Sequence, residues 1–392
     1  MPDGSSVTYE NTRLADYTED ARIGRGSMDL PFLLLTLLLL TIGVVMVLSS
    51  SYARSYYDIE KETGGVATYY FVRQFIFALL GVAAMFVCSR LPISFYRRFS
   101  FPILLVAIGS LLAVLVIGTK VNGARRWINL GFTTFQPSEI AKIAVILSFS
   151  TMICRFRDRM KTFKYGIAPF AVILVVIVGL LLLEPHISAS IIIIAVGVVM
   201  LFLGGVRLYW FIALGGVTLG AGIIVVTKMA YAVTRIQTWL DPFSDMQGDG
   251  WQIVQSLYAI GSGGLLGLGL GNSRQKYLYL PEEHNDFIFS VVCEELGLIG
   301  ALLILALFAL LIIRGYWLAM HARDRYSCLV CAGISTLLAL QVILNIAVVT
   351  NLVPCTGISL PFFSYGGTAL LLQMAEMGII LSISRDIPTK SD

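Results

Sequence analysis

Long apolar runs recur along almost the whole chain, and they constrain its fold more than any other feature. A helix needs about 20 predominantly apolar residues to cross the hydrocarbon core of a bilayer. The runs of roughly this length are Pro31 to Ser50, Phe71 to Cys88, Phe101 to Gly118, Pro137 to Cys154, Ile167 to Leu183, Ser188 to Gly204, Leu208 to Thr227, Phe287 to Ile313, Ser327 to Thr350 and Ser364 to Ile383. Only 13% of the residues are charged, against about a quarter in soluble domains. The sequence therefore predicts an all-α polytopic membrane protein of about ten transmembrane helices.

The basic residues between these runs predict which side of the membrane each connection faces. Lys and Arg are enriched in short cytoplasmic connections, and the inner side collects the greater share of them when both termini are cytoplasmic. The chain then divides into a cytoplasmic tail (1–28), spans one to seven (29–227), a large extracytoplasmic loop (228–286), spans eight to ten (287–384) and a second tail (385–392). The net charge of +4 is modest and spread out, so nothing favours nucleic-acid binding.

The extracytoplasmic loop contains turn residues followed by a helical pattern. Asp241, Pro242 and Asp245 favour turns, and the apolar residues of WQIVQSLYAI (Trp251 to Ile260) recur at the spacing of a half-buried helix that ends in glycines. We expect an interfacial helix that lies on the outer leaflet.

A cluster of titratable residues lies at the end of this loop. Glu282, Glu283, His284 and Asp286 fall within five positions, directly before the eighth span. Like charges at the mouth of a membrane span repel one another and lose solvation. A solvated loop whose charges mark the membrane boundary is the simpler interpretation, but the glycine-rich approach and the nearby Arg274 and Lys276 favour a functional site.

Basic residues on the predicted outer side depart from the general trend. Lys120, Arg125 and Arg126 crowd one short connection, and Arg274 and Lys276 precede the acidic cluster. Bulk lipid headgroups would satisfy a single arginine, whereas two basic groups that flank one acidic cluster indicate a pocket for a specific phosphorylated lipid.

Several polar residues fall inside predicted spans. Glu139 and Lys142 stand three residues apart on one helix and can pair, and we expect the pair to face protein or water, as a structural clamp or as a substrate ligand. Of Glu294 and Glu295, one is expected to meet a basic partner inside the bundle. His186 is expected to be a satisfied interface histidine, with a ligand role as the alternative.

Three blocks of the sequence resemble signature blocks of the SEDS proteins, the shape, elongation, division and sporulation proteins of bacteria. They are GARRWINLG with QPSEIAK (Gly123 to Lys142), GDGWQIVQSLYAIGSGGLLGLGLGNSRQKYLYLPEEHNDFIFSVVCEELG (Gly248 to Gly297) and LPFFSYGGTALL (Leu360 to Leu371). Within that family, GLGNSRQKYLYLPE is more similar to the FtsW-like division and sporulation branch than to the RodA-like elongation branch.

The resemblance implies a ten-span peptidoglycan glycosyltransferase of the bacterial cytoplasmic membrane, active at the division septum. Such enzymes polymerise lipid II, a disaccharide peptide linked to undecaprenyl diphosphate, at the outer face of the membrane. The implied partners are a class B penicillin-binding protein, which is a transpeptidase, and other divisome membrane proteins. A requirement for Mg²⁺ or Mn²⁺ is implied as well, without a readable ligand set.

Individual site residues follow from the motif positions. The essential acid of the family falls on Asp286, and its intramembrane acid and base fall on Glu139 and Lys142. Asn285 departs from the usual threonine, and His186 stands where many members have an aspartate, so a role for that aspartate has no support here.

The implied reaction also fits the residue types. A carboxylate whose pKa is raised by acidic neighbours suits the base that deprotonates an acceptor hydroxyl, and cations stabilise a departing diphosphate. Asp286 is the predicted catalytic base. The predicted substrate-binding residues are Lys120, Arg125, Arg126, Glu139, Lys142, Arg274, Lys276, Glu283 and His284.

Three other functions stay open at this point. A lipid II flippase would also need many spans and an anion site, but it should show a polar path to the inner leaflet as well. An elongation-type polymerase differs only in the process that it serves. A scaffold that recruits the division machinery would need surfaces alone.

Overall fold

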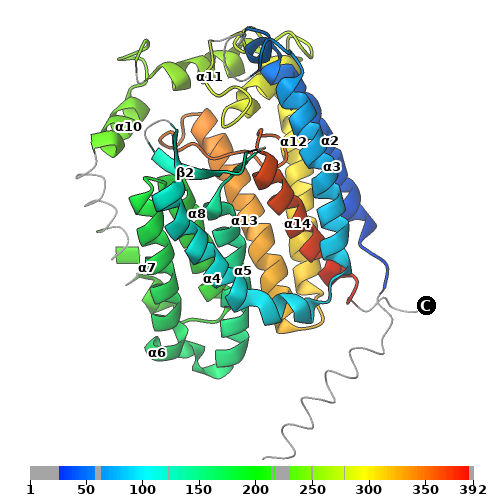
Figure 1. Cartoon of the computed structure of the whole chain (residues 1–392), viewed down its shortest axis with the longest axis vertical. Coiled ribbons are helices and arrows are strands. Elements are labelled where there is room, and N and C mark those ends of the chain that lie inside the picture. Colours follow the sequence, from blue (N-terminus) through cyan, green and yellow to red (C-terminus); the bar gives the residue numbers. More distant parts are fainter. Residues whose placement is uncertain are drawn as a thin grey trace, which may run out of the picture.

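Long helices lie side by side and form a bundle in the computed structural model (Figure 1). The structure describes residues 26–57, 63–121, 124–131, 133–212, 215–216, 220, 230–248, 250–277 and 279–387. The bundle consists of α2 (Leu30–Tyr57), α3 (Tyr69–Arg90), α4 (Ile93–Ile117), α5 (Pro137–Phe156), α7 (Ala168–Leu183), α8 (Ile187–Leu203), α12 (Ile288–Met320), α13 (Arg325–Val349) and α14 (Gly367–Ser384). The short elements η1 (Arg157–Lys161) and α6 (Phe163–Gly166) join α5 to α7.

The predicted spans coincide with these helices wherever the structure describes them. Seven described helices are long and apolar enough to cross a membrane, when α6 and α7 are taken together as the run Phe163–Leu183. α8 is apolar but has only 17 residues, and the 20-residue α5 carries Glu139 and Lys142. The seventh predicted span, Leu208 to Thr227, lies largely outside the described residues. A multi-pass helical membrane protein is thus confirmed, while the count of ten spans stays a prediction.

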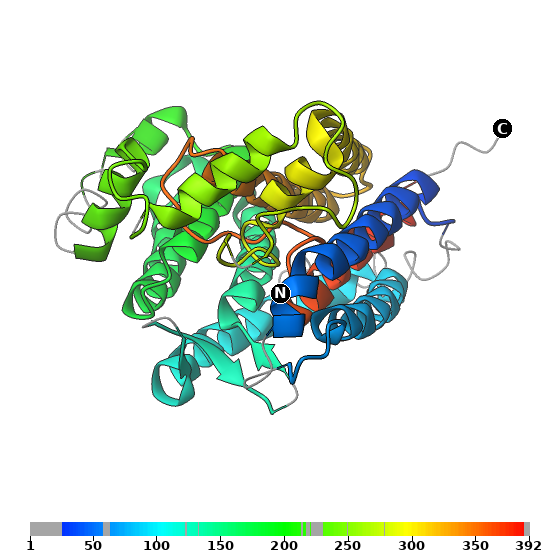
Figure 2. The same ribbon diagram turned by 90° about the horizontal axis from the view of Figure 1, so that it is seen from above.

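One end of the bundle carries most of the remaining described elements, and we call it the loop end. It holds α10 (Ala230–Leu240), α11 (Trp251–Ser262), the segment from Gly263 to Phe287 and the strands between α4 and α5 (Figures 1 and 2). The two described ends of the chain meet at the opposite end of the bundle, where the Gly26 amide donates to the Arg385 carbonyl at 2.9 Å.

The strands correct the all-α prediction. β1 (Thr119–Val121), β2 (Ala124–Asn129) and β3 (Thr134–Phe135) form an antiparallel sheet of order β1-β2-β3, in which Lys120 pairs with Arg125. This connection is rich in β-branched and aromatic residues, such as Trp127 and Ile128, which favour strands. The sheet fixes the direction in which the basic residues of β2 project.

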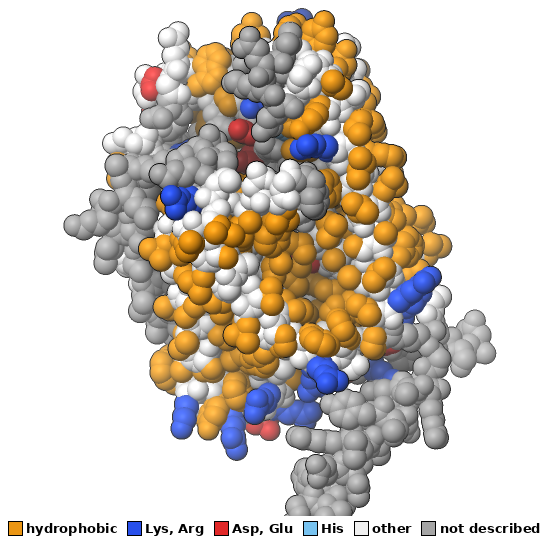
Figure 3. Space-filling model, in the orientation of Figure 1, with side chains coloured by type: hydrophobic (Ala, Val, Ile, Leu, Met, Phe, Trp, Pro, Cys, Tyr) orange, Lys and Arg blue, Asp and Glu red, His pale blue; other side chains and the backbone are white. Residues whose placement is uncertain are grey.

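The helices at the centre of the bundle differ from those at its edge. From Ala141 to Ser150 every residue of α5 is buried, and α13 is also mostly buried. α7, by contrast, exposes Val172, Val175 and Leu183, as expected for a helix that faces lipid. Hydrophobic side chains cover the middle of the face in Figure 3, with Lys and Arg at its lower end and acidic side chains in a hollow near its upper end.

The predicted orientation assigns the loop end to the outside of the cell, and thiol labelling tests it. In a cysteine-free variant, a membrane-impermeant thiol reagent should label Asp245→Cys in intact spheroplasts but not Ser27→Cys, because the inward excess of Lys and Arg orients the spans. Labelling after lysis provides the control for both positions. Labelling of Ser27→Cys alone in intact cells would reverse the topology.

Candidate active site

The acidic segment before α12 is held in place by residues that come much later in the chain. The Tyr365 amide donates to the His284 carbonyl at 2.9 Å, and the Ser364 hydroxyl donates to the Asn285 carbonyl at 2.8 Å. The side-chain amide of Asn345 on α13 donates to the carbonyls of Asp286 and Ile358, at 2.8 and 2.6 Å. The second and third sequence blocks therefore form one site at the loop end.

The carboxyl group of Asp286 has an unusual electrostatic environment. Burial, followed by the charge of Glu282, raises its pKa to about 6, and His284, Arg126 and Arg235 partly oppose this rise. The backbone of Gly357, at a φ of +67°, passes so close that an added Cβ would lie 3.0 Å from Asp286 Oδ2. A carboxyl group with a pKa near neutrality is suited to general-base chemistry at physiological pH.

Two arginines from different elements act on Asp286. Arg126 projects from β2, and its guanidinium donates to the Pro185 carbonyl. Arg235 lies on α10, and its Nη1 donates to the Cys355 carbonyl at 3.2 Å. The sequence predicted Arg126 as a site residue but missed Arg235, because nothing in the sequence indicates that α10 packs beside the acidic segment.

Of the other two basic residues predicted in this connection, Arg125 is directed elsewhere. Nη1 of Arg125 donates to the Leu115 carbonyl, at the end of α4, at 3.2 Å, and Arg125 is exposed. The backbone of Lys120 belongs to β1, whereas its side chain lies outside the described part of the molecule.

Glu283 and His284 contact the first two helices of the bundle. Glu283 is 1% exposed and forms an ion pair with Arg54 of α2 at 3.3 Å. The His284 ring lies 4.6 Å from the ring of Tyr70 and 5.8 Å from that of Tyr365. These contacts dock the acidic segment on α2 and α3. The substrate-binding roles predicted for both residues stay predictions.

Lys276 is buried in the bundle, which does not fit the predicted contact with a substrate diphosphate. It is 2% exposed, and its Nζ lies 2.8 Å from Glu295 Oε1, 2.6 Å from the Gly271 carbonyl and 3.2 Å from Ser49 Oγ. These partners occupy the ammonium group, so Lys276 is an interior cation. The expectation that one of Glu294 and Glu295 meets a basic partner is confirmed.

Glu294 organises the segment that contains Arg274. Its carboxylate accepts hydrogen bonds from the amides of Arg274 and Gln275, at 2.9 and 3.3 Å, and from the Ser273 hydroxyl. Within the described residues, the structure shows no contact of the Arg274 side chain. Its predicted contact with the substrate stays a prediction.

The glycine-rich stretch before the acidic segment has a packing role. An added Cβ on Gly267, at a φ of +80°, would lie 2.2 Å from the Glu295 carbonyl. Gly297 of α12, at a φ of +67°, meets the same loop from the other side. The amides of Leu268 and Gly269 donate to the Glu294 and Glu295 carbonyls at 3.0 Å. The glycines that favoured a site in the sequence thus allow the loop to pack on α12.

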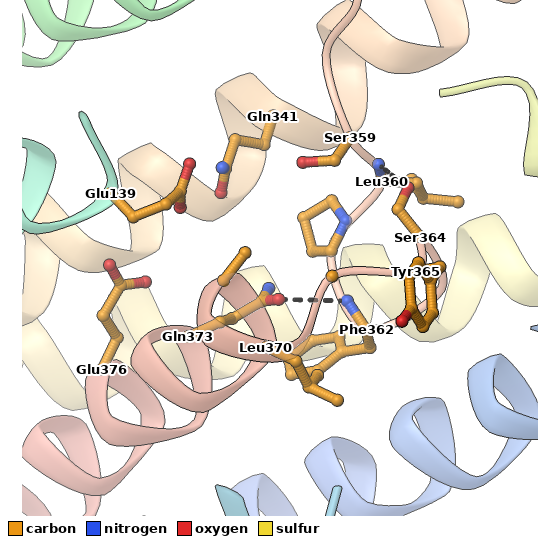
Figure 4. A pocket seen from close by; sticks show the side chains of 13 residues that line it. Glu139, Gln341, Ser359, Leu360, Phe362, Ser364, Tyr365, Leu370, Gln373 and Glu376 are labelled. Carbon is orange, nitrogen blue, oxygen red and sulfur yellow. Dashed lines mark hydrogen bonds between the residues drawn. The ribbon is translucent and has the colours of Figure 1, made fainter. Parts of the chain in front are cut away.

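A second polar centre lies between the membrane helices. Glu139 and Lys142 pair at 2.8 Å, and Lys142 is 4% exposed. Figure 4 shows Glu376 of α14 across from Glu139. Both acids line a cavity of about 30 Å³ that is also lined by Gln341 and by the segment Ser359–Gly366, and that volume can hold a water molecule. The predicted pair is confirmed, whereas Glu376, an acid within a predicted span, was not among the predicted site residues.

The turn between α7 and α8 adds two buried titratable groups near Arg126. Burial raises the pKa of Glu184 to about 8, and Arg126 partly opposes this rise. Burial, with the charges of Arg126 and Lys142, lowers the pKa of His186 to about 3. His186 Nε2 lies 3.4 Å from the side-chain nitrogen of Gln136. A neutral, buried His186 fits the interface interpretation, and Glu184 was missed.

The residues described do not fit a metal ion. No group of three or more His, Cys, Asp or Glu side chains within the described ranges is placed to hold one. Of the acids near Asp286, Glu283 is paired with Arg54, and Glu282 accepts from the Asn285 side chain at 2.6 Å. The implied need for Mg²⁺ or Mn²⁺ therefore stays a prediction.

The fold and the site together define a multi-pass membrane protein with one buried carboxyl group, that of Asp286, which lies at the loop end and is influenced electrostatically by two arginines. The family model described as "Cell cycle protein", named for FtsW, RodA and SpoVE, matches residues 30–388. The chain belongs to this family, which confirms the resemblance to the SEDS proteins.

Individual relatives cover nearly the whole chain. The protein named "Probable peptidoglycan glycosyltransferase FtsW" of Trichlorobacter lovleyi is 41% identical over 91% of this chain and 93% of its own length. "Stage V sporulation protein E" of Bacillus subtilis is 39% identical over 92% of this chain and 97% of its own length.

Solved structures agree with this assignment. One is described as "Structural coordination of polymerization and crosslinking by a peptidoglycan synthase complex"; a chain in it is 29% identical, with a TM-score of 0.75 over 93% of this chain and 99% of its own length. RodA of Thermus thermophilus is 26% identical, with a TM-score of 0.67 over 93% of this chain and 98% of its own length.

Proposed function

We propose that this protein is a peptidoglycan glycosyltransferase that polymerises lipid II at the outer face of the bacterial cytoplasmic membrane, for septal synthesis in cell division. The observation that carries the proposal is the environment of Asp286, a carboxyl group with a pKa near 6 that is acted on by Arg126 and Arg235. Relatives named FtsW at about 40% identity support the same activity.

The proposed reaction joins two lipid-linked disaccharides. The 4-hydroxyl of the acceptor sugar attacks the anomeric carbon of the donor, and the bond from that carbon to the diphosphate oxygen breaks. Asp286 takes the hydroxyl proton, and the lipid diphosphate leaves with the bonding electron pair, so that the α-linkage is inverted to β. Arg126 stabilises the charge that develops on the diphosphate, in a site where preorganised cations are most effective.

The partners and the location are proposed from the descriptions of related proteins. The structure described as a peptidoglycan synthase complex couples polymerization to crosslinking, which supports a class B penicillin-binding protein as the partner of this chain. Other divisome membrane proteins and the septum are proposed from the FtsW-named relatives. Depletion of FtsW or of RodA in a host cell, followed by complementation with this chain, separates the division role from the elongation role.

Polymerisation itself is tested directly. The purified protein, together with its transpeptidase partner in liposomes, should convert lipid II into glycan polymer. A flippase is the second candidate, because the cavity lined by Glu139 and Glu376 extends polar groups from the loop end into the bundle. Translocation of labelled lipid II without any polymer would favour the flippase.

The rate of polymerisation is expected to rise with pH and to level off above the pKa of Asp286, which is about 6. Only the ionised carboxylate can accept the proton, so kcat/KM for lipid II, measured from about pH 5 to 8, should follow its ionisation. Glu282→Gln removes a negative charge that raises this pKa, and the midpoint should move to lower pH. A flat profile in both proteins would exclude Asp286 as the titrating base.

Arg126→Gln is expected to lower kcat/KM for lipid II by about 10²-fold, the typical effect of losing one group that stabilises developing negative charge. Arg125→Gln is the matched control, because its guanidinium is exposed and directed at the end of α4. Its effect should be much smaller. Equal rates for the two variants at subsaturating lipid II would leave Arg126 as an ordinary interfacial residue.

A further inference from the structure

A cavity of about 280 Å³ lies between α10 and α11 at the loop end, and no step of the proposed reaction uses it. Its lining includes Thr234, Arg235, Thr238, Trp251, Gln252 and Pro281. Ligand pockets for drug-sized molecules measure about 300–1,000 Å³, so this cavity is large enough for a single sugar ring and too small for a disaccharide peptide.

The walls of the cavity are held by the segment that follows α13. Trp239 of α10 and Asn351 exchange hydrogen bonds, with Trp239 Nε1 3.1 Å from the Asn351 carbonyl and Asn351 Nδ2 3.2 Å from the Trp239 carbonyl. Arg235 donates to the Cys355 carbonyl on the same segment. Gly250 allows the turn into α11, since an added Cβ would lie 2.2 Å from the Pro242 carbonyl. Specific hydrogen bonds and a close backbone approach therefore fix the walls of the cavity.

The same segment and the same arginine connect the cavity to Asp286. Arg235 lines the cavity and acts electrostatically on Asp286. Two residues after Cys355, Gly357 passes against the Asp286 carboxylate, and Pro281 directly precedes Glu282. The cavity and Asp286 are thus connected through Arg235, through the segment that contains Cys355 and Gly357, and through the chain from Pro281 to Asp286.

The cavity and Arg126 lie in different parts of the loop end. The cavity is formed by α10 and α11, whereas Arg126 belongs to β2. Seen from above, the strands that carry Arg126 lie at one edge of the loop end, and α10 and α11 lie across from them (Figure 2). In an inverting displacement, the acceptor hydroxyl attacks the anomeric carbon on the face opposite to the leaving group. The acceptor and the diphosphate must therefore bind on opposite sides of that carbon. With the diphosphate on the side of Arg126, the acceptor belongs on the side of Arg235.

The lining of the cavity suits a sugar better than a diphosphate. An indole ring can pack against the apolar face of a pyranose, and threonine hydroxyls and a glutamine amide can bond sugar hydroxyls and an N-acetyl group. Arg235 is the one cation among the lining residues that the structure describes, whereas a diphosphate carries several charges. We propose that this cavity is the subsite for the N-acetylated sugar of the acceptor that presents the attacking hydroxyl. The assignment rests on the proposed polymerase function.

The experiment separates the two substrates of the reaction. A lipid II analogue whose terminal 4-hydroxyl is inverted can donate but not accept, and one with a carbon link in place of the anomeric oxygen can accept but not donate. The two analogues can react with each other only once, and the rate of this reaction is measured. Trp251→Leu should raise the acceptor concentration that gives the half-maximal rate at least about tenfold, the effect of losing one well-packed aromatic contact. The half-saturating donor concentration should stay within about twofold.

Three further variants distinguish a loss of acceptor binding from a merely structural effect. Trp251→Phe keeps an aromatic face and should recover most of the acceptor affinity, and Tyr258→Leu removes an exposed aromatic side chain of α11 that does not line the cavity. Thr238→Val should raise the half-saturating acceptor concentration with little change in kcat. All variants are compared as intact complexes with the transpeptidase partner.

A binding measurement keeps the inference separate from the proposed activity. The soluble disaccharide of N-acetylglucosamine and N-acetylmuramic acid should slow the reaction of Thr238→Cys with a thiol reagent, in a background without other cysteines, even if the parent makes no polymer. Failure of polymerisation with intact protection would remove the proposed function but leave a sugar site. Unchanged acceptor saturation in Trp251→Leu, or protection by inorganic pyrophosphate but not by the disaccharide, would overturn the subsite.

Discussion

Asp286→Asn should make almost no glycan polymer while the protein stays folded. Asparagine keeps the size of the side chain and most of its hydrogen bonding but cannot accept the proton of the attacking hydroxyl. Losing a general base typically costs about 10²–10⁴ in rate. The main contacts that hold this segment use the backbone carbonyl of Asp286, which Asn345 bonds at 2.8 Å, and the substitution preserves it. Polymer formed from lipid II in liposomes, together with binding of lipid II and of the transpeptidase, measures the outcome.

The control is Asp241→Asn, which neutralises an exposed carboxylate of the same loop and should retain the parental rate. Substantial polymer from Asp286→Asn would move the base to another acid. Glu139 would then be the better candidate, because its side chain is 16% exposed and lines a cavity, whereas that of Glu283 is 1% exposed. An inactive variant that also fails to bind lipid II would indicate a ligand role for Asp286.

Lys276→Met is expected to destabilise the folded protein by about 3–5 kcal/mol, since it leaves the buried carboxylate of Glu295 without its cation. Ser49 still donates to Glu295, but a hydroxyl does not neutralise the charge. The midpoint of thermal unfolding in detergent, followed by near-UV circular dichroism, should fall clearly below that of the parent.

The double variant Lys276→Met with Glu295→Gln provides the comparison, because it removes both charges and keeps an acceptor for Ser49. Its stability should recover much of the loss, as is found when both members of a buried ion pair are replaced. A Lys276→Met protein as stable as the parent but defective in lipid II turnover would restore the role that the sequence suggested for Lys276.

The helices of the bundle could be predicted because each membrane span is recognisable from its own run of apolar residues. A run of about 20 apolar residues has few alternatives to a helix in a bilayer, and α2, α3 and α12 appear where the runs are. The strands β1, β2 and β3 are too short to leave a periodic signal, and their existence depends on pairing with one another. Packing of the loop end is likewise a tertiary property.

The site was predictable only in part. Asp286 and the pair of Glu139 and Lys142 followed from motif positions, and the structure gives both a distinctive environment. The burial of Lys276 and its pairing with Glu295 were not predicted, because proximity in sequence to the acidic cluster does not fix the direction of a side chain. Arg235 was missed because its place beside Asp286 depends on how α10 docks against the segment after α13.

The contacts that hold the acidic segment from Glu282 to Asp286 have a consequence for biosynthesis. Asn345, Ser364 and Tyr365, which bond this segment, all follow it in the chain, on α13 and just before α14. A nascent chain that has been inserted as far as α12 already displays the carboxylate but has none of these bonds. The site is completed only when the last two helices enter the membrane, so a chain arrested earlier in translation carries the acid without the contacts that position it.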